Sequence, residues 1–479
     1  MATQKILFGE WMPDQPGISG ALMDAKNVVS QAVGYGPLNS AATFSAAAAE
    51  SLTTLVAGKT PAGVTKLFAA GSTKIYEVSG VGALTNVSKA GGYSAADRFR
   101  FTQFGNTIIG TDYNSVLQSF VLGTSSAFGN LSASAPIAKY ITVVRDFVVV
   151  AFTNESGTVY PTRVRWSDIN DETTWTSGST SQADYQDIPD GGQITGIRGG
   201  EYGLIFMEKA IHRMSYIGTP LIFQFDNISR GKGCISAGSI AQVQGISFFL
   251  SDDGFYMCDG QSIKPIGNEK IDRWFYEIAD EAAFGTMSCA VNPVKKLVIW
   301  NFKTVNGNRQ LLIYNFNTSK WTYGDAGADY ISDASTTSVT LEEIDSISAS
   351  IDALNVSLDS ILFIGGKYFL GGTNGAYVVT YNGLPATAKI VTGDVDAGSR
   401  SLVTLVRPQV DNGSASVAVV SRTLLSESVE FGTATAADSE NRVSLRSNGR
   451  YHRFQVNPTG SNWKTAVGME IDLVGQGAR

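Results

Sequence analysis

Two histidines and three cysteines are the side chains with which this sequence could bind a metal ion or perform nucleophilic catalysis. His212 and His452 lie far apart, and Cys234, Cys258 and Cys289 show none of the close spacings typical of metal ligands. Counting residues does not exclude a Ser–His–Asp triad, but the sequence contains no Gly-x-Ser-x-Gly turn to present a nucleophilic serine. We therefore expect no metal site, no cofactor and no catalytic residue.

Carboxylates are the remaining candidates for catalysis, because glycoside hydrolases act with a pair of acids. The acidic clusters are Asp252 with Asp253, Asp168 with Asp171 and Glu172, and Asp187 with Asp190. Each cluster falls in a predicted turn, where Asp is favoured because it hydrogen-bonds its own backbone. Glycan cleavage is kept as an alternative function, and a non-enzymatic protein is the expectation.

Two further patterns imitate sites that bind phosphate or nucleic acid. The segment 57–60, Ala-Gly-Lys-Thr, resembles the end of a phosphate-binding loop, but Thr53 stands where the first glycine belongs and Pro61 follows. Basic and aromatic residues alternate in 98–101 and 450–454. In a strand this alternation divides them between two faces, so neither cluster predicts a continuous track for phosphates.

Composition excludes several classes of protein. The 479 residues carry a net charge of −7 at a pI near 5.1, which disfavours tight binding of DNA. Only 16% of residues are charged and 43% are hydrophobic, which argues against disorder and against coiled coils. An odd, low number of cysteines is typical of a reducing compartment, and no apolar stretch approaches the roughly 18 residues of a membrane helix.

The elements that would position these residues are short strands rich in β-branched and aromatic residues. Turns with Gly, Asn or Asp separate them, as in 98–110, 246–260 and 295–316. Hairpin units begin near Val64, Arg98, Ala135, Gln193, Ser236 and Met287, at intervals of 34 to 58 residues. Because propeller blades repeat at about 40–50 residues, the sequence predicts an all-β protein with a β-propeller of about six blades.

Two segments interrupt this pattern. Residues 269–280 carry apolar side chains at helical spacing, so we expect a short helix there. Residues 326–360 are rich in Ser, Asp and Asn and contain a stripe of Ile and Leu, which predicts a loop insertion with a short helix. The domain boundaries expected are 1–63 for an N-terminal arm or platform segment and 64–383 for the propeller.

Past residue 383 the chain changes character. Residues 384–479 contain ten Lys and Arg against nine Asp and Glu, a net charge of +1 that leaves −8 on residues 1–383. Val and Arg alternate there, which predicts a separate β-sandwich-like domain acting as a platform. Its arginines, among them Arg407, Arg450 and Arg453, are interpreted either as charges that keep strand edges soluble or as contacts with a partner.

Several short motifs resemble one known family. They are 10–17 (Glu-Trp-Met-Pro-Asp-Gln-Pro-Gly) with 25–28 and 35–38, 163–168 with Thr174 and Trp175, 357–360 with Gly365 and Gly366, and 449–454 with Trp463 and 466–470. Together they resemble the tail-nozzle or tail-hub proteins of short-tailed bacteriophages, also called packaged-DNA stabilisation proteins.

This resemblance implies a structural virion protein, a hexamer forming a tube below the portal and adaptor rings, assembled in the bacterial cytoplasm. It implies as partners further copies of the chain, the adaptor, tail-fibre or tail-needle and spike proteins, and double-stranded DNA that passes without specific binding. The arginines named above, or alternatively Trp11, are the candidate subunit or adaptor contacts. The alternative function is a glycan-binding or glycan-hydrolysing propeller of an adhesion apparatus.

Overall fold

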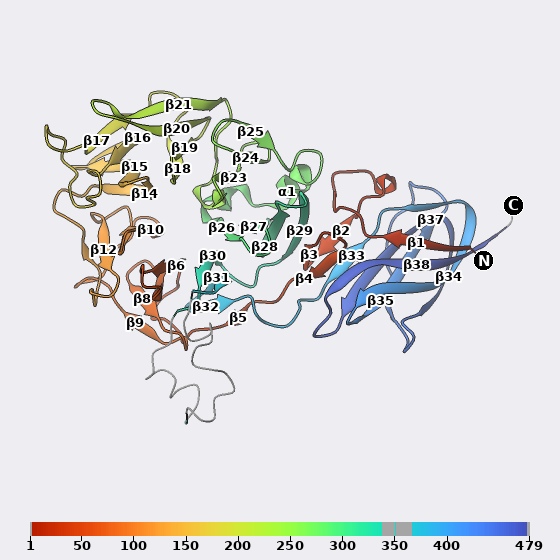
Figure 1. Cartoon of the computed structure of the whole chain (residues 1–479). Helices are drawn as coiled ribbons and strands as arrows, with labels where there is room; N and C mark the ends of the chain where they lie inside the picture. The colour runs from red at the N-terminus through yellow and green to blue at the C-terminus, as the bar shows by residue number, and fades with distance from the viewer. Residues whose placement is uncertain (1, 338–349, 351–365, 477–479) are drawn as a thin grey trace.

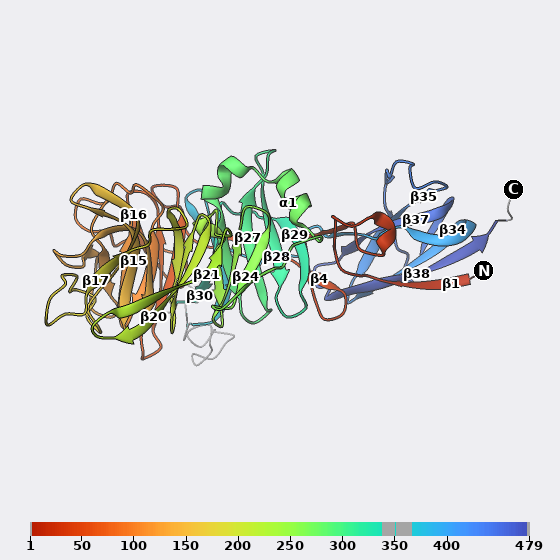
Figure 2. The ribbon, with the colours of Figure 1, turned by 90° about the horizontal axis from the view of Figure 1, so that it is seen from above.

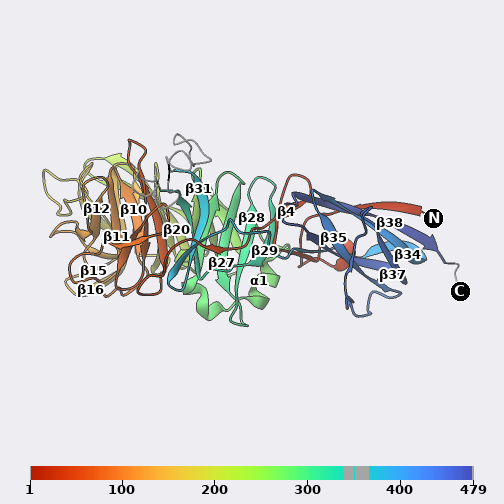
Figure 3. The same ribbon diagram turned by 90° about the horizontal axis from the view of Figure 1, so that it is seen from below.

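The computed structural model describes residues 2–337, 350 and 366–476, and these residues form a β-propeller joined to a β domain (Figure 1). Edge-on views show the two parts lying side by side, with the propeller as a thick disc (Figures 2 and 3). The all-β propeller predicted from the sequence is therefore confirmed.

Six blades are separate four-stranded antiparallel sheets. The first three blades are β6–β9 (Thr54–Lys59, Thr65–Ala70, Ile75–Val78, Leu84–Asn86), β10–β13 (Arg100–Phe104, Thr107–Thr111, Gln118–Val121, Gly129–Asn130) and β14–β17 (Ile137–Val144, Phe147–Glu155, Thr158–Trp166, Asp184–Asp187). The next two are β18–β21 (Ile194–Arg198, Gly203–Met207, Ala210–Gly218, Ile222–Arg230) and β22–β25 (Ala241–Val243, Ile246–Leu250, Phe255–Cys258, Ile263–Pro265). The sixth combines β30–β32 (Tyr330–Ser335, Tyr368–Asn374, Tyr377–Thr380) with β5 (Ala42–Thr43) from near the N-terminus.

Four more strands, β26–β29 (Ser288–Asn292, Leu297–Lys303, Arg309–Asn315, Lys320–Asp325), occupy the remaining place in the circle. They do not form a separate sheet, because β29 pairs with β2 (Asp24–Lys26) and β2 pairs with β33 (Lys389–Val391). The blade thus continues into a 14-stranded sheet of the C-terminal β domain.

The rest of that sheet comes from both ends of the chain. Its strands are β1 (Ala2–Leu7), β3 (Val28–Ser30), β4 (Tyr35–Pro37), β34 (Val395–Asp411), β35 (Ser414–Arg422), β36 (Thr435–Ala436), β37 (Val443–Thr459) and β38 (Thr465–Gly475). The first strand pairs with the last, Ala2 opposite Leu473 through Leu7 opposite Gly468. The described helices are short: η1 (Gly17–Ser19), η2 (Ala237–Ser239), α1 (Asp272–Ile278) and η3 (Glu281–Thr286).

Apolar clusters between the blades close the circle. Each neighbouring pair of blades shares one buried cluster, including the pair formed by the β5 blade and the β6 blade. Between the β6–β9 blade and the β10–β13 blade, the ring centres of Phe68 and Phe120 lie 5.0 Å apart. The largest cluster runs from β22–β29 into the C-terminal β domain, so one core supports both parts.

The hairpin turns lie where the sequence predicts them. Gly105, with φ of +55°, connects β10 to β11, and Gly307, with φ of +82°, lies between β27 and β28. Residues with side chains rarely adopt these backbone angles, which explains the choice of glycine at both turns. The helix expected in 269–280 is confirmed as α1.

Three expected boundaries need correction. The propeller starts before residue 64, because β5 and β6 belong to its blades. Residues 1–63 are not a single arm, since β1–β4 pair within the C-terminal sheet. The insertion expected at 326–360 overlaps β30, a blade strand; most of its remainder, including the predicted helix, lies outside the described residues. Sequence patterns missed these points because the pairing partners are distant in the chain.

Candidate functional site

A polar cavity lies at the centre of the propeller. It has a volume of about 530 Å³ and is lined by the innermost strand of every blade. Its polar and ionisable lining residues include Arg98, Arg100, Arg198, Tyr140, Gln242, Cys289, Tyr330, Asp333 and Tyr368. Asp333 is the only carboxyl residue among the described lining residues. This cavity is called the central channel below.

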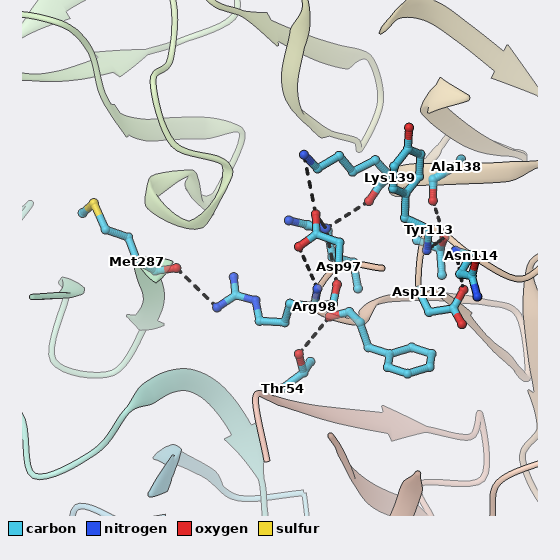
Figure 4. A network of polar contacts seen from close by, with 12 residues as sticks. Thr54, Asp97, Arg98, Asp112, Tyr113, Asn114, Ala138, Lys139 and Met287 are labelled. Carbon is cyan, nitrogen blue, oxygen red and sulfur yellow. Dashed lines mark hydrogen bonds and ion pairs between the residues drawn. The ribbon is translucent and has the colours of Figure 1, made fainter. Parts of the chain in front are cut away.

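Arg98 enters the channel just before β10. Its Nη1 donates to the backbone oxygen of Met287 at 3.3 Å (Figure 4). Its guanidinium lies 5.0 Å from the ring centre of Tyr330. Burial, together with the positive charge of Arg100, lowers the pKa of Arg98 to about 10. Arg98 forms no ion pair with any residue that the structure describes.

Arg100, the next residue on that face, has its charge balanced. Its Nη1 lies 3.0 Å from Asp97, and Lys139 lies 3.7 Å from the same carboxylate. Burial by itself raises the pKa of Asp97, but the two cations and the hydrogen bonds from Arg98 and Arg100 lower it overall. Phe99, between the two arginines, is buried against Tyr93, so the alternation in 98–101 divides the residues between channel and core as predicted.

Arg198 and Cys289 meet at the backbone carbonyl of Ile240, the residue directly after η2. The backbone oxygen of Ile240 accepts hydrogen bonds from Nη2 of Arg198 and, at 3.2 Å, from Sγ of Cys289. Burial raises the pKa of Cys289 to about 11, so its thiol is protonated at neutral pH. Arg198 also has no ion pair within the described part of the chain.

The histidines and acidic clusters lie elsewhere. His212 is paired at 3.4 Å with Asn227, and His452 lies buried between Ser401 and Ser421. Asp252 and Asp253 both pair with Lys232 at 2.8 Å in a turn. Asp187 lies in β17 rather than in a turn and pairs with Arg163 at 2.8 Å. Within the described residues no group of His, Cys, Asp and Glu could hold a metal ion, and no helix is long and apolar enough to cross a membrane.

The four candidate contact residues differ in exposure. Trp11 is fully buried, with ring centres of Trp274 and Tyr323 at 4.8 and 5.1 Å, so it is a core residue and not a surface contact. Its position before two prolines did not reveal this, because its partners come from α1 and β29.

Arg453 is also mostly buried. Its guanidinium pairs at 2.7 Å with Asp394, a carboxylate with 3% side-chain exposure that Arg422 also contacts. Arg407 and Arg450 remain partly exposed and pair with Asp472 at 3.2 Å and Asp396 at 3.1 Å. Arg407 and Arg450 are therefore the two candidates whose side chains are accessible to a partner.

Comparisons with known proteins give information on the fold and not on the function. No model of a known protein family and no curated protein matches the sequence. Similar solved structures include the WD40 domain of Neurospora crassa Pan2, at 9% identity and a TM-score of 0.38, covering 72% of this chain and 96% of that one. Streptogramin B lyase is similar at 12% identity and a TM-score of 0.34, covering 61% of this chain and 90% of that one. The WD40 domain of Toxoplasma gondii coronin is similar at 10% identity and a TM-score of 0.38, covering 74% of this chain and 87% of that one. At this level of similarity nothing about their activities transfers to this chain.

Proposed function

We propose that this protein is a structural, non-enzymatic subunit of a short bacteriophage tail. In this proposal about six copies form a ring below the portal and adaptor, which retains packaged DNA and conducts it during ejection. The observation that carries the proposal is the continuity of the 14-stranded sheet from blade β26–β29 into the C-terminal β domain. A shared sheet and a shared core make the two parts one stiff unit, as a ring under pressure from packaged DNA requires.

Side-chain contacts reinforce the junction between the two parts. Asn27 donates at 2.9 Å to both Asp325 and the backbone oxygen of Thr387, and it accepts from the backbone of Asp325 at 2.8 Å. Lys26 pairs with Asp325 at 2.9 Å. Hydrogen bonds from one residue to both sides resist hinge motion between the parts.

Charge supports passage of DNA without capture. The net charge of −8 on residues 1–383 provides no excess of cations to displace counterions from the duplex. The positive charges of the C-terminal segment are local, and Arg407 and Arg450 are the accessible ones proposed to meet the adaptor. Tail-fibre, needle or spike proteins are the further partners proposed.

The alternative is a glycan-binding or glycan-hydrolysing propeller. Hydrolysis needs two acids about 5–10 Å apart, and among the described channel-lining residues Asp333 stands alone. The first proposal is therefore favoured.

Mass measurement combined with an assay for polysaccharide cleavage tests the proposal. We expect the purified full-length chain to form a closed ring, alone or with adaptor, and to leave host polysaccharide intact. A permanent monomer that cleaves polysaccharide, with cleavage lost in Asp333→Asn, would overturn it.

A further inference from the structure

We propose that the central channel binds a small solute that carries an oxyanion, a phosphate or carboxylate group, between Arg98 and Arg198. This site is independent of the tail function proposed above, since it lies inside a single propeller. The volume of about 530 Å³ falls in the range of small-molecule sites.

The first reason is the unbalanced charge of Arg98. The described contacts of its guanidinium group are one carbonyl oxygen, at 3.3 Å, and the ring of Tyr330. A guanidinium has five N–H donors, and an enclosed charge without a counterion is costly. Arg100, two residues further along the chain, shows the contrast, because Asp97 pairs with it at 3.0 Å. An oxyanion in the channel would supply to Arg98 what Asp97 supplies to Arg100.

The second reason is that Arg198 reaches the same region from another blade. Arg98 contacts the carbonyl of Met287, Arg198 contacts that of Ile240, and Cys289, two residues beyond Met287, shares the Ile240 carbonyl. The thiol of Cys289 lies in the electrostatic field of both guanidinium groups. Both arginines line the same channel and both act on Cys289, and guanidinium N–H groups are the donors best suited to phosphate and carboxylate.

A third observation concerns Tyr368, which also lines the channel. Its hydroxyl oxygen is buried and has no hydrogen-bond partner among the described residues. Buried hydroxyl groups in proteins are almost always hydrogen-bonded, so an unpaired one indicates a missing partner. A bound oxyanion would accept this hydrogen bond.

Asp333 sets the strength of binding. Asp333 lines the same channel, where burial raises the pKa of its carboxyl group and the positive charge of Arg198 partly opposes that shift. When it is ionised, this carboxylate repels an incoming anion, so the arginines must outweigh it. Replacing Asp333 by Asn should therefore strengthen binding increasingly as pH rises and the wild-type carboxyl group ionises, an effect that loss of folding cannot imitate.

Isothermal titration calorimetry of the full chain with inorganic phosphate, and separately with citrate, tests the proposal at constant ionic strength. We expect saturable binding at one site per chain for at least one anion, and the stronger of the two identifies the phosphate or carboxylate source. Arg98→Gln and Arg198→Gln should each weaken binding by about tenfold or more, because each removes a charge-assisted contact. At alkaline pH, where Asp333 is ionised, Asp333→Asn should tighten binding several-fold, and Arg450→Gln, an exposed arginine outside the channel, should leave it unchanged.

Absence of saturable heat with both anions would overturn the proposal. Equal affinities in Arg198→Gln and Arg450→Gln would also overturn it, because binding would then lie elsewhere. If Arg98→Gln fails to fold, the comparison of wild type, Arg198→Gln and Asp333→Asn decides. An affinity in Asp333→Asn that equals that of wild type at neutral and at alkaline pH counts against the channel.

Discussion

Arg450 and Arg453 lie on the same strand, β37, yet their surroundings give them different roles. Arg453 contacts Asp394 at 2.7 Å within a buried group that includes Arg422, whereas Arg450 pairs with Asp396 at the surface. Their spacing in the sequence predicts strand residues, but only the packing of β33 and β35 against β37 decides which arginine is buried. The sequence likewise suggests that Trp11 is a surface contact although it is buried, because burial depends on partners far along the chain.

Substitution of Arg453 should therefore affect stability rather than docking. We expect Arg453→Met to lower the free energy of unfolding by about 1–3 kcal/mol, because Asp394 loses one of its two charged partners in a buried site. Urea unfolding measures the change. The matched control, Arg450→Met, should leave the midpoint nearly unchanged, because exposed ion pairs contribute little. Equal midpoints for the two variants would contradict this assignment.

We expect His452 to make the stability of the C-terminal β domain sensitive to acid. It is fully buried, its ring nitrogens lie 2.8 and 2.7 Å from the hydroxyl groups of Ser401 and Ser421, and burial lowers its pKa. The unfolded chain then binds a proton near pH 6.5 that the folded chain does not, so stability should fall as pH drops below about 6.5. Urea midpoints of wild type and His452→Gln between pH 7.5 and about 5 check this, and the variant should show the shallower slope. Parallel slopes would mean that His452 does not titrate as described.

At the scale of elements, α1 shows what sequence periodicity can and cannot predict. Its apolar spacing predicted a helix, found at Asp272–Ile278, but did not show that the N-terminal segment holds it in place. Both carboxylate oxygens of Asp14 accept from the backbone of α1, at 3.0 Å from Arg273 and 2.9 Å from Trp274. Asp272 lies buried beside this contact, and its carboxylate accepts from the backbone of Phe255 at 3.2 Å.

The burial of Asp272 at the start of α1 should make the stability of the folded chain dependent on pH. Burial, and to a lesser degree the charges of Asp14 and Asp253, raises the pKa of Asp272 to about 7. The folded chain therefore binds a proton that the unfolded chain releases near its ordinary pKa of 3.8, so this contribution to stability is complete below about pH 4 and is lost as pH rises through about 7.

Asp272→Asn keeps the acceptor but cannot ionise. We expect it to be close to wild type at pH 4 and more stable by about 2–4 kcal/mol at pH 8, measured by urea unfolding at both values. Asp253→Asn, at an exposed position paired with Lys232, is the control and should show a much smaller difference. A constant difference between Asp272→Asn and wild type at the two pH values would contradict the prediction.

At the scale of the whole molecule, the sequence predicted the propeller because blade hairpins are local. The pairings between distant parts of the chain were not predictable. Strand β5 completes the blade that begins at Tyr330, and β1 pairs with β38 across nearly the full length of the chain. The channel was also hidden, because its arginines come from different blades and share no sequence motif. The form and role of the C-terminal β domain as a platform stay predictions.

The most direct test of the structural role is electron microscopy of phage heads that carry portal and adaptor, mixed with the purified full-length chain. We predict added density with six-fold symmetry below the adaptor, and retention of packaged DNA that heads without the chain lose. Charge reversal at Arg450 should weaken this attachment while the protein stays folded, and the difference from wild type should shrink at high salt, because salt screens exposed charges. Heads that gain no density and lose their DNA equally with and without the folded wild-type chain would contradict the account.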